Sequence, residues 1–150
     1  MRNKVKFIKT KSEVPLVRFL LPNGKGGIAI VDTGSESTIF DPGFVAANKE
    51  EFNIKTTKDK INFVGIEKDS EHVIITAEGK LLLGGEDRVF VTLPISAVLM
   101  DLSHIREHFK NEYGTDIKIA ALIGSDFLTK IKGKINFKEK TMSFDYGLPC

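Results

Sequence analysis

Cysteine, tryptophan and long apolar runs are scarce or missing in this sequence, and each absence removes a class of protein. The 150 residues hold one cysteine, Cys150, and no tryptophan. One cysteine excludes an intrachain disulfide, which fits a reducing compartment. No apolar run approaches the roughly 20 residues of a membrane-spanning helix, and residues 1–7 lack the apolar core of a secretory signal. We therefore expect a cytoplasmic protein with no membrane partner; trimming from a longer precursor is left open.

An excess of charge of either sign is also missing. The 22 basic and 20 acidic residues give a formal net charge of +2. This balance offers no electrostatic reason to expect a nucleic acid or an anionic membrane as a partner. The hydrophobic share of 41% is ordinary for a globular protein. A chain of this length most simply forms one domain, over residues 1–150, with a core of its own.

Short β-prone runs separated by turn signals fill most of the first hundred residues. Asn23-Gly24 predicts a hairpin turn, Asp41-Pro42-Gly43 predicts a turn or helix start, and Glu78-Gly79-Lys80 predicts a further turn. A short helix is expected over 44–52. Strands are expected at 5–7, 14–21, 28–31, 38–40, 61–66, 71–77, 81–83 and 88–99. Many short strands in succession are typical of an all-β sandwich or barrel.

The last fifty residues combine helices with strands. Leu102, Ile105 and Phe109 recur at helical spacing, which predicts a helix over 101–113 that Gly114 ends. An apolar run at 119–124 is expected as a buried strand. A short helix should follow over 125–131, with Ser125 or Asp126 as its N-cap. A hairpin of 134–137 with 141–144 completes the pattern.

Asp32 is the residue around which the first half is arranged. It directly follows the apolar, β-branched run 28–31 and precedes Thr33 and Gly34. A carboxylate in this place is costly unless it is hydrogen-bonded, paired or functional. The same three residues also suit a strand end followed by a turn.

Val31-Asp32-Thr33-Gly34-Ser35 resembles the active-site motif of the aspartic proteases, and the short chain is similar to their single-lobe, retropepsin-like branch. Leu122-Ile123-Gly124 matches the apolar-apolar-glycine element of the same family. The resemblance implies an all-β chain with the closed barrel of the acid protease fold. It also implies a flap, which corresponds to the hairpin at 61–75, and one short C-terminal helix. The helix at 101–113 looks like an insertion.

The resemblance also implies an activity, aspartic endopeptidase, without metal or cofactor. The chain has one Asp-Thr-Gly, and the chemistry needs two carboxylates that share a proton, so it implies a homodimer acting on a peptide or protein. Asp32, Thr33 and Gly34 are the catalytic residues, with Thr33 reaching across the dimer axis. Ser35 is expected to hydrogen-bond Asp32. The positions expected around the substrate are Ile30, Ser35, Glu36, Val64, Gly65, Ile66, Val98, Ile123 and Gly124.

The sequence departs from the family pattern in two places. Retroviral members carry an arginine after the second glycine, paired with an acid two residues past Asp-Thr-Gly; here Ser125 and Glu36 hold these places. The flap region 61–66 has Gly65 as its one glycine, where family flaps are richer in glycine. A non-catalytic dimeric domain that binds peptides or acts as a scaffold is the alternative function.

A second motif points to other chemistry. His104-Ile105-Arg106-Glu107-His108 matches H-x-x-E-H, which places two histidines on one face of a helix where they could bind zinc. Glu112 lies one turn further on and could complete a surface site. A solvated, charged helix face explains the same residues, and we expect no metal site.

Overall fold

The structure is a computed structural model that describes residues 2–59, 72–85, 91–114 and 116–145. These residues form strands and helices in an order close to the one expected. The elements are β1 (Arg2–Lys6), β2 (Leu16–Leu20), β3 (Gly26–Val31), β4 (Ile39–Phe40), α1 (Pro42–Ala47), the 3₁₀ helix η1 (Lys49–Glu51), β5 (Phe52–Asp59), β6 (His72–Gly84), β7 (Val91–Leu99), α2 (Ser103–Tyr113), β8 (Ile119–Ile123), α3 (Ser125–Lys130), β9 (Lys134–Asn136) and β10 (Thr141–Asp145).

Six strands close into a barrel. They pair in the order β2-β3-β8-β4-β7-β6, and β6 pairs back with β2 to complete the ring. β5 lies outside the ring and pairs with β6. β3 and β8 run parallel side by side at the centre, with Val31 opposite Ile123. The prediction of a closed β-barrel is therefore confirmed.

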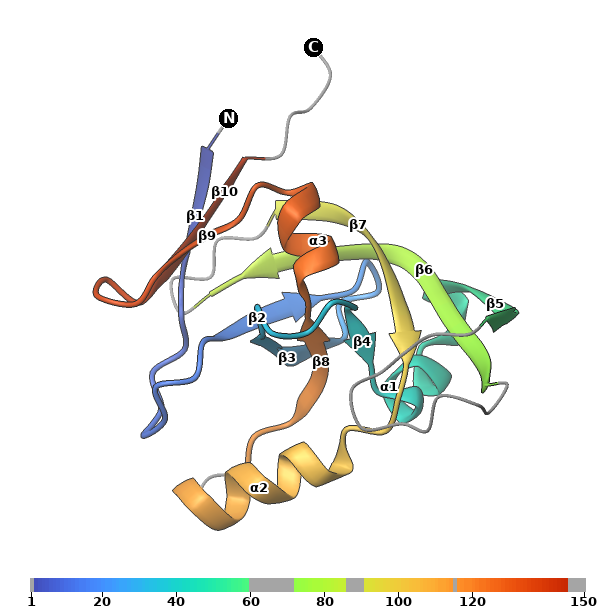
Figure 1. Cartoon of the computed structure of the whole chain (residues 1–150), viewed down its shortest axis with the longest axis horizontal. Coiled ribbons are helices and arrows are strands. Elements are labelled where there is room, and N and C mark those ends of the chain that lie inside the picture. Colours follow the sequence, from blue (N-terminus) through green and yellow to red (C-terminus); the bar gives the residue numbers. More distant parts are fainter. Residues whose placement is uncertain (1, 60–71, 86–90, 115, 146–150) are drawn as a thin grey trace.

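The two ends of the described chain meet in a separate three-stranded sheet. β10 lies between β1 and β9 and is antiparallel to both. Figure 1 shows this sheet at the end of the molecule opposite α2. Val5 of β1 is fully buried, whereas Lys4 and Lys6 on either side are exposed. This alternation is typical of an edge strand with lysine facing solvent.

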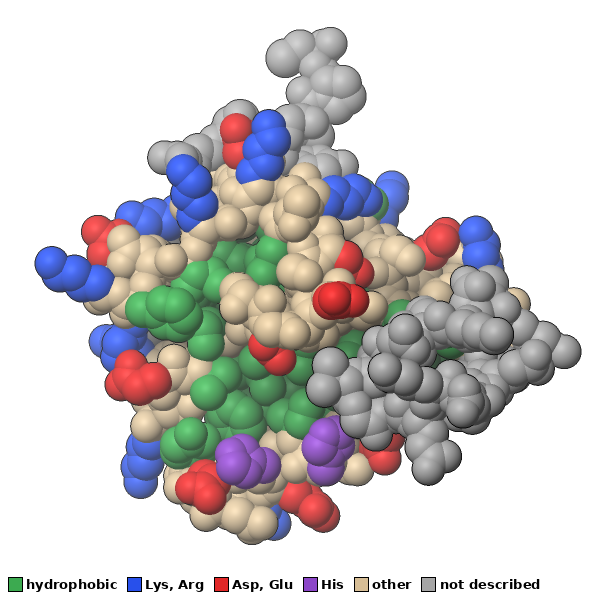
Figure 2. All heavy atoms as spheres, in the orientation of Figure 1, with side chains coloured by type: hydrophobic (Ala, Val, Ile, Leu, Met, Phe, Trp, Pro, Cys, Tyr) green, Lys and Arg blue, Asp and Glu red, His purple; other side chains and the backbone are tan. Residues whose placement is uncertain are grey.

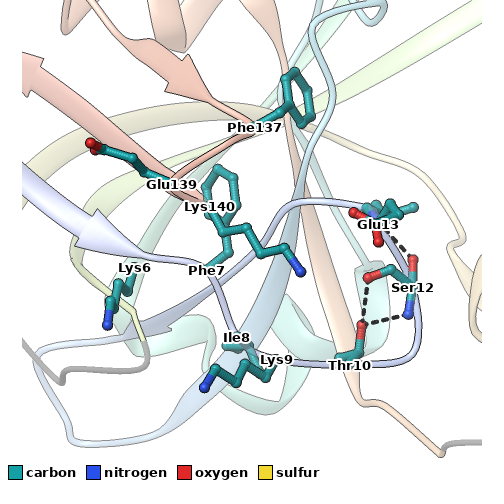
Figure 3. Close-up of a pocket in the computed structure, with 11 residues that line it drawn as sticks. Lys6, Phe7, Ile8, Lys9, Thr10, Ser12, Glu13, Phe137, Glu139 and Lys140 are labelled. Atoms are coloured by element: carbon teal, nitrogen blue, oxygen red, sulfur yellow. Dashed lines mark hydrogen bonds between the residues drawn. The ribbon is translucent and has the colours of Figure 1, made fainter.

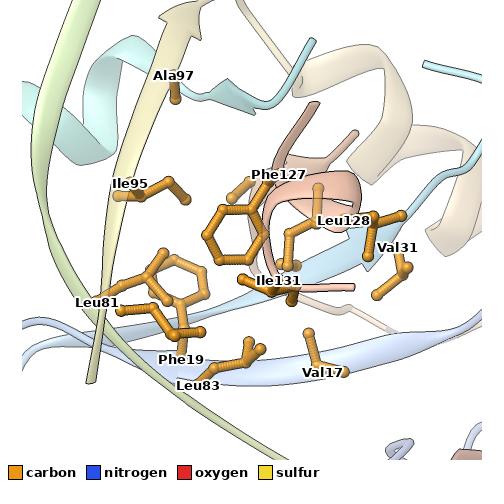
Figure 4. Close-up of a cluster of buried hydrophobic side chains, with 14 of the residues drawn as sticks. Val17, Phe19, Val31, Leu81, Leu83, Ile95, Ala97, Phe127, Leu128 and Ile131 are labelled. Carbon is orange, nitrogen blue, oxygen red and sulfur yellow. The ribbon is translucent and has the colours of Figure 1, made fainter. Parts of the chain in front are cut away.

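The barrel interior is filled from the barrel wall and from α3. Val17, Phe19 and Leu83 of the wall are at most 1% exposed. Phe127 of α3 and Ile131, the C-cap residue of α3, point toward them and close the interior (Figure 4). Each fully buried side chain of this kind stabilises the fold by about 1.5–3 kcal/mol. The short helix after Gly124 is thus part of the core that fixes the loop before it.

The predicted turn at 78–80 is wrong, because β6 runs through it without a break. Gly79 pairs with Phe52 of β5. A Cβ on Gly79 would lie 2.8 Å from the Glu51 carbonyl oxygen and 3.1 Å from the Phe52 ring. The glycine therefore serves the close approach of η1 and β5 to β6, and not a change of direction.

The hairpin expected at 61–75 begins earlier than predicted. Its two arms are β5 and β6, which pair from Phe52 opposite Gly79 to Asp59 opposite His72. The helix expected over 44–52 is shorter for the same reason: α1 ends at Ala47 and Phe52 already belongs to β5. The predicted flap residues Val64, Gly65 and Ile66 lie outside the described residues.

α2 is the helix predicted over 101–113, and Gly114 ends it with a left-handed φ of 65°. Its first turn is held by Asp101, whose carboxylate accepts hydrogen bonds from the backbone N–H and the hydroxyl of Ser103. The same bonds lower the pKa of Asp101 below its ordinary value. None of the helices in the described ranges combines the length and apolar character that a membrane span requires.

A buried carboxylate joins α2 to the barrel. Asp41 is the N-cap of α1, where its side chain accepts a hydrogen bond from Gly43 N–H. Its other oxygen accepts from Leu102 N–H at 3.0 Å and from Arg106 at 3.2 Å. Arg106 also donates to the Ile119 carbonyl of β8 at 2.9 Å. One side chain thus satisfies donors from α1, from the start of α2 and from Arg106.

We expect Asp41→Ala to lower the free energy of unfolding by about 3 kcal/mol, because it removes a helix cap and leaves a buried N–H without a partner. Urea unfolding followed by circular dichroism measures this loss. Asp116→Ala, at an exposed position, is the control and should change stability by less than about 0.5 kcal/mol. Equal stability of the two variants would contradict the role assigned to Asp41.

Candidate active site

Asp32 is the first residue beyond β3 and is held by backbone hydrogen bonds. Its N–H donates to the Ile123 carbonyl at 2.9 Å, which extends the pairing of β3 with β8 by one residue. Its Oδ1 accepts from Gly34 N–H at 2.9 Å, and its carbonyl accepts from Ser35 N–H at 3.2 Å. The strand and the turn together fix the carboxylate at the carboxyl end of the parallel pair, half-buried.

The turn after Asp32 is tied to a second turn that is far away in sequence. Ser125 N–H donates to the Ser35 carbonyl at 2.7 Å, and Asp126 N–H donates to the Glu36 carbonyl at 3.2 Å. These bonds join the residues that follow β3 to the first turn of α3. Because a hydrogen-bonded loop has few alternative conformations, the position of Asp32 is set before any ligand arrives.

Thr38 and Asp126 form the side-chain part of this connection. The Thr38 hydroxyl donates to the Asp126 carboxylate at 2.7 Å, and Thr38 N–H donates to the other oxygen at 3.2 Å. The same hydroxyl accepts from Gly124 N–H at 3.1 Å. Thr38 is fully buried, so all its polar atoms are satisfied within the protein.

Gly124 is required by the close approach of the two turns. A Cβ at this position would lie 2.5 Å from the Ser37 carbonyl oxygen and 2.8 Å from that of Ser35. Both atoms belong to the backbone and cannot move without moving the turn that follows Asp32. Gly124 is also the N-cap of α3, so the prediction that Ser125 or Asp126 caps this helix is wrong.

The comparisons with known proteins identify the fold. No protein-family model matches the chain, and no curated protein matches it. Among solved structures, it is similar to a retropepsin-like aspartic protease from Rickettsia conorii with a TM-score of 0.52 at 10% identity. The similarity covers 99% of this chain and 95% of that one. The chain has the retropepsin-like fold. The predicted resemblance is confirmed at the level of the fold.

Within the retropepsin-like fold, the site residues predicted from the motifs are only partly brought together. Asp32, Gly34, Ser35, Glu36 and Gly124 all lie in the two joined turns. Ser35 does contact Asp32, but through its backbone, because its hydroxyl donates to the Ser37 carbonyl at 2.8 Å. Glu36 is exposed and contributes its carbonyl to the connection. The side-chain bonds that join the two turns are those between Thr38 and Asp126, and Ser125 and Glu36 take part through their backbone.

Thr33 lies on the surface beside these turns. It is exposed, and within the described ranges its hydroxyl has no hydrogen-bond partner. With Ser125 it borders a shallow hollow whose apolar side chains are Leu128, Ile135 and Phe137. A polar group next to apolar surface at this point is available to a second molecule.

The apolar residues predicted beside Asp32 fall into two groups. Ile30 of β3 lies opposite Leu122 of β8, which lies opposite Ile39 of β4, which in turn lies opposite Val98 of β7. In this row Ile30, Leu122 and Ile39 are at most 8% exposed and belong to a buried cluster with Phe109 of α2, whereas Val98 is partly exposed. Ile123 is 1% exposed and packs in the barrel interior, because side chains alternate along a strand.

The zinc alternative has no geometric support in the described part of the chain. His104, Glu107, His108 and Glu112 are exposed on α2. Across the described ranges, no group of three or more His, Cys, Asp or Glu side chains lies close enough to hold a metal ion. A solvated helix face accounts for these residues.

We predict that Gly124→Ala destabilises the protein by at least about 2 kcal/mol, because the added Cβ forces two backbone turns apart. Gly133→Ala is the matched control: its Cβ would meet the Leu128 side chain at 3.1 Å, and a side chain can rotate away. Urea midpoints of the two variants provide the comparison. The close-approach argument fails if Gly124→Ala is as stable as Gly133→Ala.

Proposed function

We propose that this chain is an aspartic endopeptidase that acts as a homodimer. The observation that carries the proposal is the Asp32 turn: a half-exposed carboxylate, fixed by backbone bonds from β8 and α3, in a chain with the retropepsin-like fold. A structural carboxylate at a strand end would not need a second turn to hold it. Fixed geometry of this kind is what general acid–base catalysis requires.

The chemistry needs a second carboxylate, and the sequence holds one Asp-Thr-Gly. A second copy related by a two-fold axis supplies it. Two carboxylates in contact cannot both ionise, so the pair shares one proton and titrates as a unit. The exposed Thr33, beside the Leu128, Ile135 and Phe137 hollow, is the surface where we expect the partner to lie.

The reaction then follows from the two protonation states. The ionised carboxylate takes a proton from a water molecule, and the water oxygen attacks the scissile carbonyl carbon. The protonated carboxylate donates a hydrogen bond to the carbonyl oxygen and stabilises its developing negative charge. An extended peptide would lie across the exposed face of the Asp32 turn, because Ile30, Leu122 and Ile39 are at most 8% exposed and pack in the buried cluster that includes Phe109 of α2. The mechanism uses no metal and no cofactor.

Asp32→Asn should lower kcat/KM for a cleaved peptide by at least about 10³-fold, because the variant has no carboxylate to activate water. A fluorogenic peptide library assayed from pH 4 to pH 7 measures the loss. Asp116→Asn, at an exposed position away from the two turns, should retain the activity of the parent. Cleavage that survives in Asp32→Asn, or that a chelator abolishes, would assign the activity to another group. Absence of cleavage in the parent, with a dimer in solution, would favour the non-catalytic peptide-binding alternative.

The shared site makes a second prediction, about mixed dimers. When a fixed amount of active chain exchanges subunits with nine equivalents of Asp32→Asn chain, its activity should fall to about one tenth, since only that share of active chains meets an active partner. Nine equivalents of an unrelated protein should have no effect. A site complete within one chain predicts unchanged activity in both mixtures, and that result would overturn the dimer proposal.

A further inference from the structure

Although the net charge is small, basic residues are concentrated near the two ends of the chain. Residues 1–13 and 130–145, which build β1, β9, β10 and the segments around them, form what we call the basic end. They hold ten basic and three acidic residues, a net charge of +7, which leaves −5 for the rest of the chain. Figure 2 shows lysine and arginine side chains along the upper and left edge, over the strands of this end. The basic end is therefore suited to an acidic partner.

The basic end also contains a cavity. It lies between the segment that joins β1 to β2 and the turn that joins β9 to β10, and its volume is about 170 Å³. Phe7, Ile8, Val14 and Phe137 provide its apolar lining (Figure 3). Phe137 is 64% exposed, the largest exposed fraction among the large apolar side chains of the described ranges. A cavity of about 150 Å³ accepts a benzene ring, so one aromatic or large aliphatic side chain fits here.

Positive charge dominates the edge of this cavity. Lys6, Lys9 and Lys140 line it, and none of them forms an ion pair with another described residue. Of the two acidic residues in the lining, Glu139 is already bound to Lys4 at 3.0 Å. Glu13 is left as the one unpaired carboxylate there. A ligand that enters the cavity therefore meets an excess of ammonium groups.

The position of Lys140 adds to this evidence. Its φ is +55°, a backbone conformation that is costly for a residue with a Cβ. Its carbonyl accepts a hydrogen bond from Phe7 N–H at 2.9 Å, which ties the β9–β10 turn to the start of the cavity lining. Figure 3 shows the Lys140 side chain extended across the cavity toward Thr10 and Ser12. The turn thus keeps a lysine where glycine or asparagine would be easier to accommodate.

We propose that this cavity binds an acidic peptide segment with one large apolar side chain as its anchor. The ring of Phe137 and the floor at Phe7 would hold the anchor, and Lys6, Lys9 and Lys140 would bind the flanking carboxylates. A nucleic acid or an anionic membrane would engage the lysines but would not need an enclosed cavity of this size. The cavity lining contains no residue of the Asp32 turn, but it shares Phe137 with the hollow beside Thr33 where we expect the dimer partner. Lys6, Lys9 and Lys140 do not line that hollow, so the lysine variants test this site apart from the proposed dimer.

The test measures binding of a fluorescein-labelled peptide, Glu-Asp-Phe-Asp-Glu, by anisotropy. The protein carries Asp32→Asn, so that no peptide is cleaved. At about 150 mM salt, distant exposed charges are largely screened. We expect saturable binding. The affinity should fall about tenfold in the double variant Lys9→Glu, Lys140→Glu, and about fivefold in the single variant Phe137→Ser. Lys25→Glu with Lys80→Glu, two exposed lysines outside the basic end, is the matched control and should change affinity less than about twofold.

Each other result counts against the proposal. If the control variant with Lys25→Glu and Lys80→Glu lost as much affinity, the peptide would be held by non-specific attraction between charges. A peptide with Ser in place of Phe that binds as well would show that the cavity takes no anchor. Tighter, lysine-dependent binding of oligouridine or of phosphatidylserine vesicles would assign the basic end to those partners instead. Thermal unfolding of each variant, compared with the parent, separates loss of binding from loss of fold.

Discussion

The hydrogen bonds between the turn after β3 and the first turn of α3 are the constraint on which the site depends. They bring residues 32–38 against residues 123–126, about ninety positions further along the chain. The contact is possible because residue 124 has no side chain and because buried Thr38 and exposed Asp126 hydrogen-bond each other. α3 in turn is fixed by Phe127 and Ile131, which fill the barrel. The position of the Asp32 carboxylate therefore depends on the packing of Phe127 and Ile131 in the core, through the hydrogen bonds between the two turns.

A second polar connection performs the same task at the other side of the barrel. Asp41 binds donors of α1 and α2, and Arg106 carries the link on to β8. α2 then covers the outer row of apolar residues with Leu102 and Phe109, which belong to the second buried cluster. The helix that the sequence marks as an insertion is therefore packed on the barrel and is not a separate appendage.

The sequence alone predicts the elements that local pattern determines. The apolar run before Asp32, the hairpin at Asn23-Gly24 and the helix ended by Gly114 all follow from spacing and turn chemistry, and all are found. The turn expected at Gly79 is wrong because a glycine signals equally a change of direction and a close backbone approach. The Thr38–Asp126 and Asp41–Arg106 contacts join residues 88 and 65 positions apart. No local pattern contains such pairs, although Asp126 directly behind the apolar-apolar-glycine element was a usable signal. The net charge does not reveal the basic end for a related reason, since it sums two regions of opposite charge.

Association of the proposed dimer is favoured because each chain already orders its own Asp32 turn. Hydrogen bonds with Ile123, Gly34, Ser125 and Asp126 of its own chain fix the Asp32 turn. A partner therefore does not have to order this turn, and association avoids the entropy cost of fixing a loop. Thr33 is exposed, and within the described part of the chain its hydroxyl has no hydrogen-bond partner. This hydroxyl is therefore available to the second copy that the proposed dimer requires.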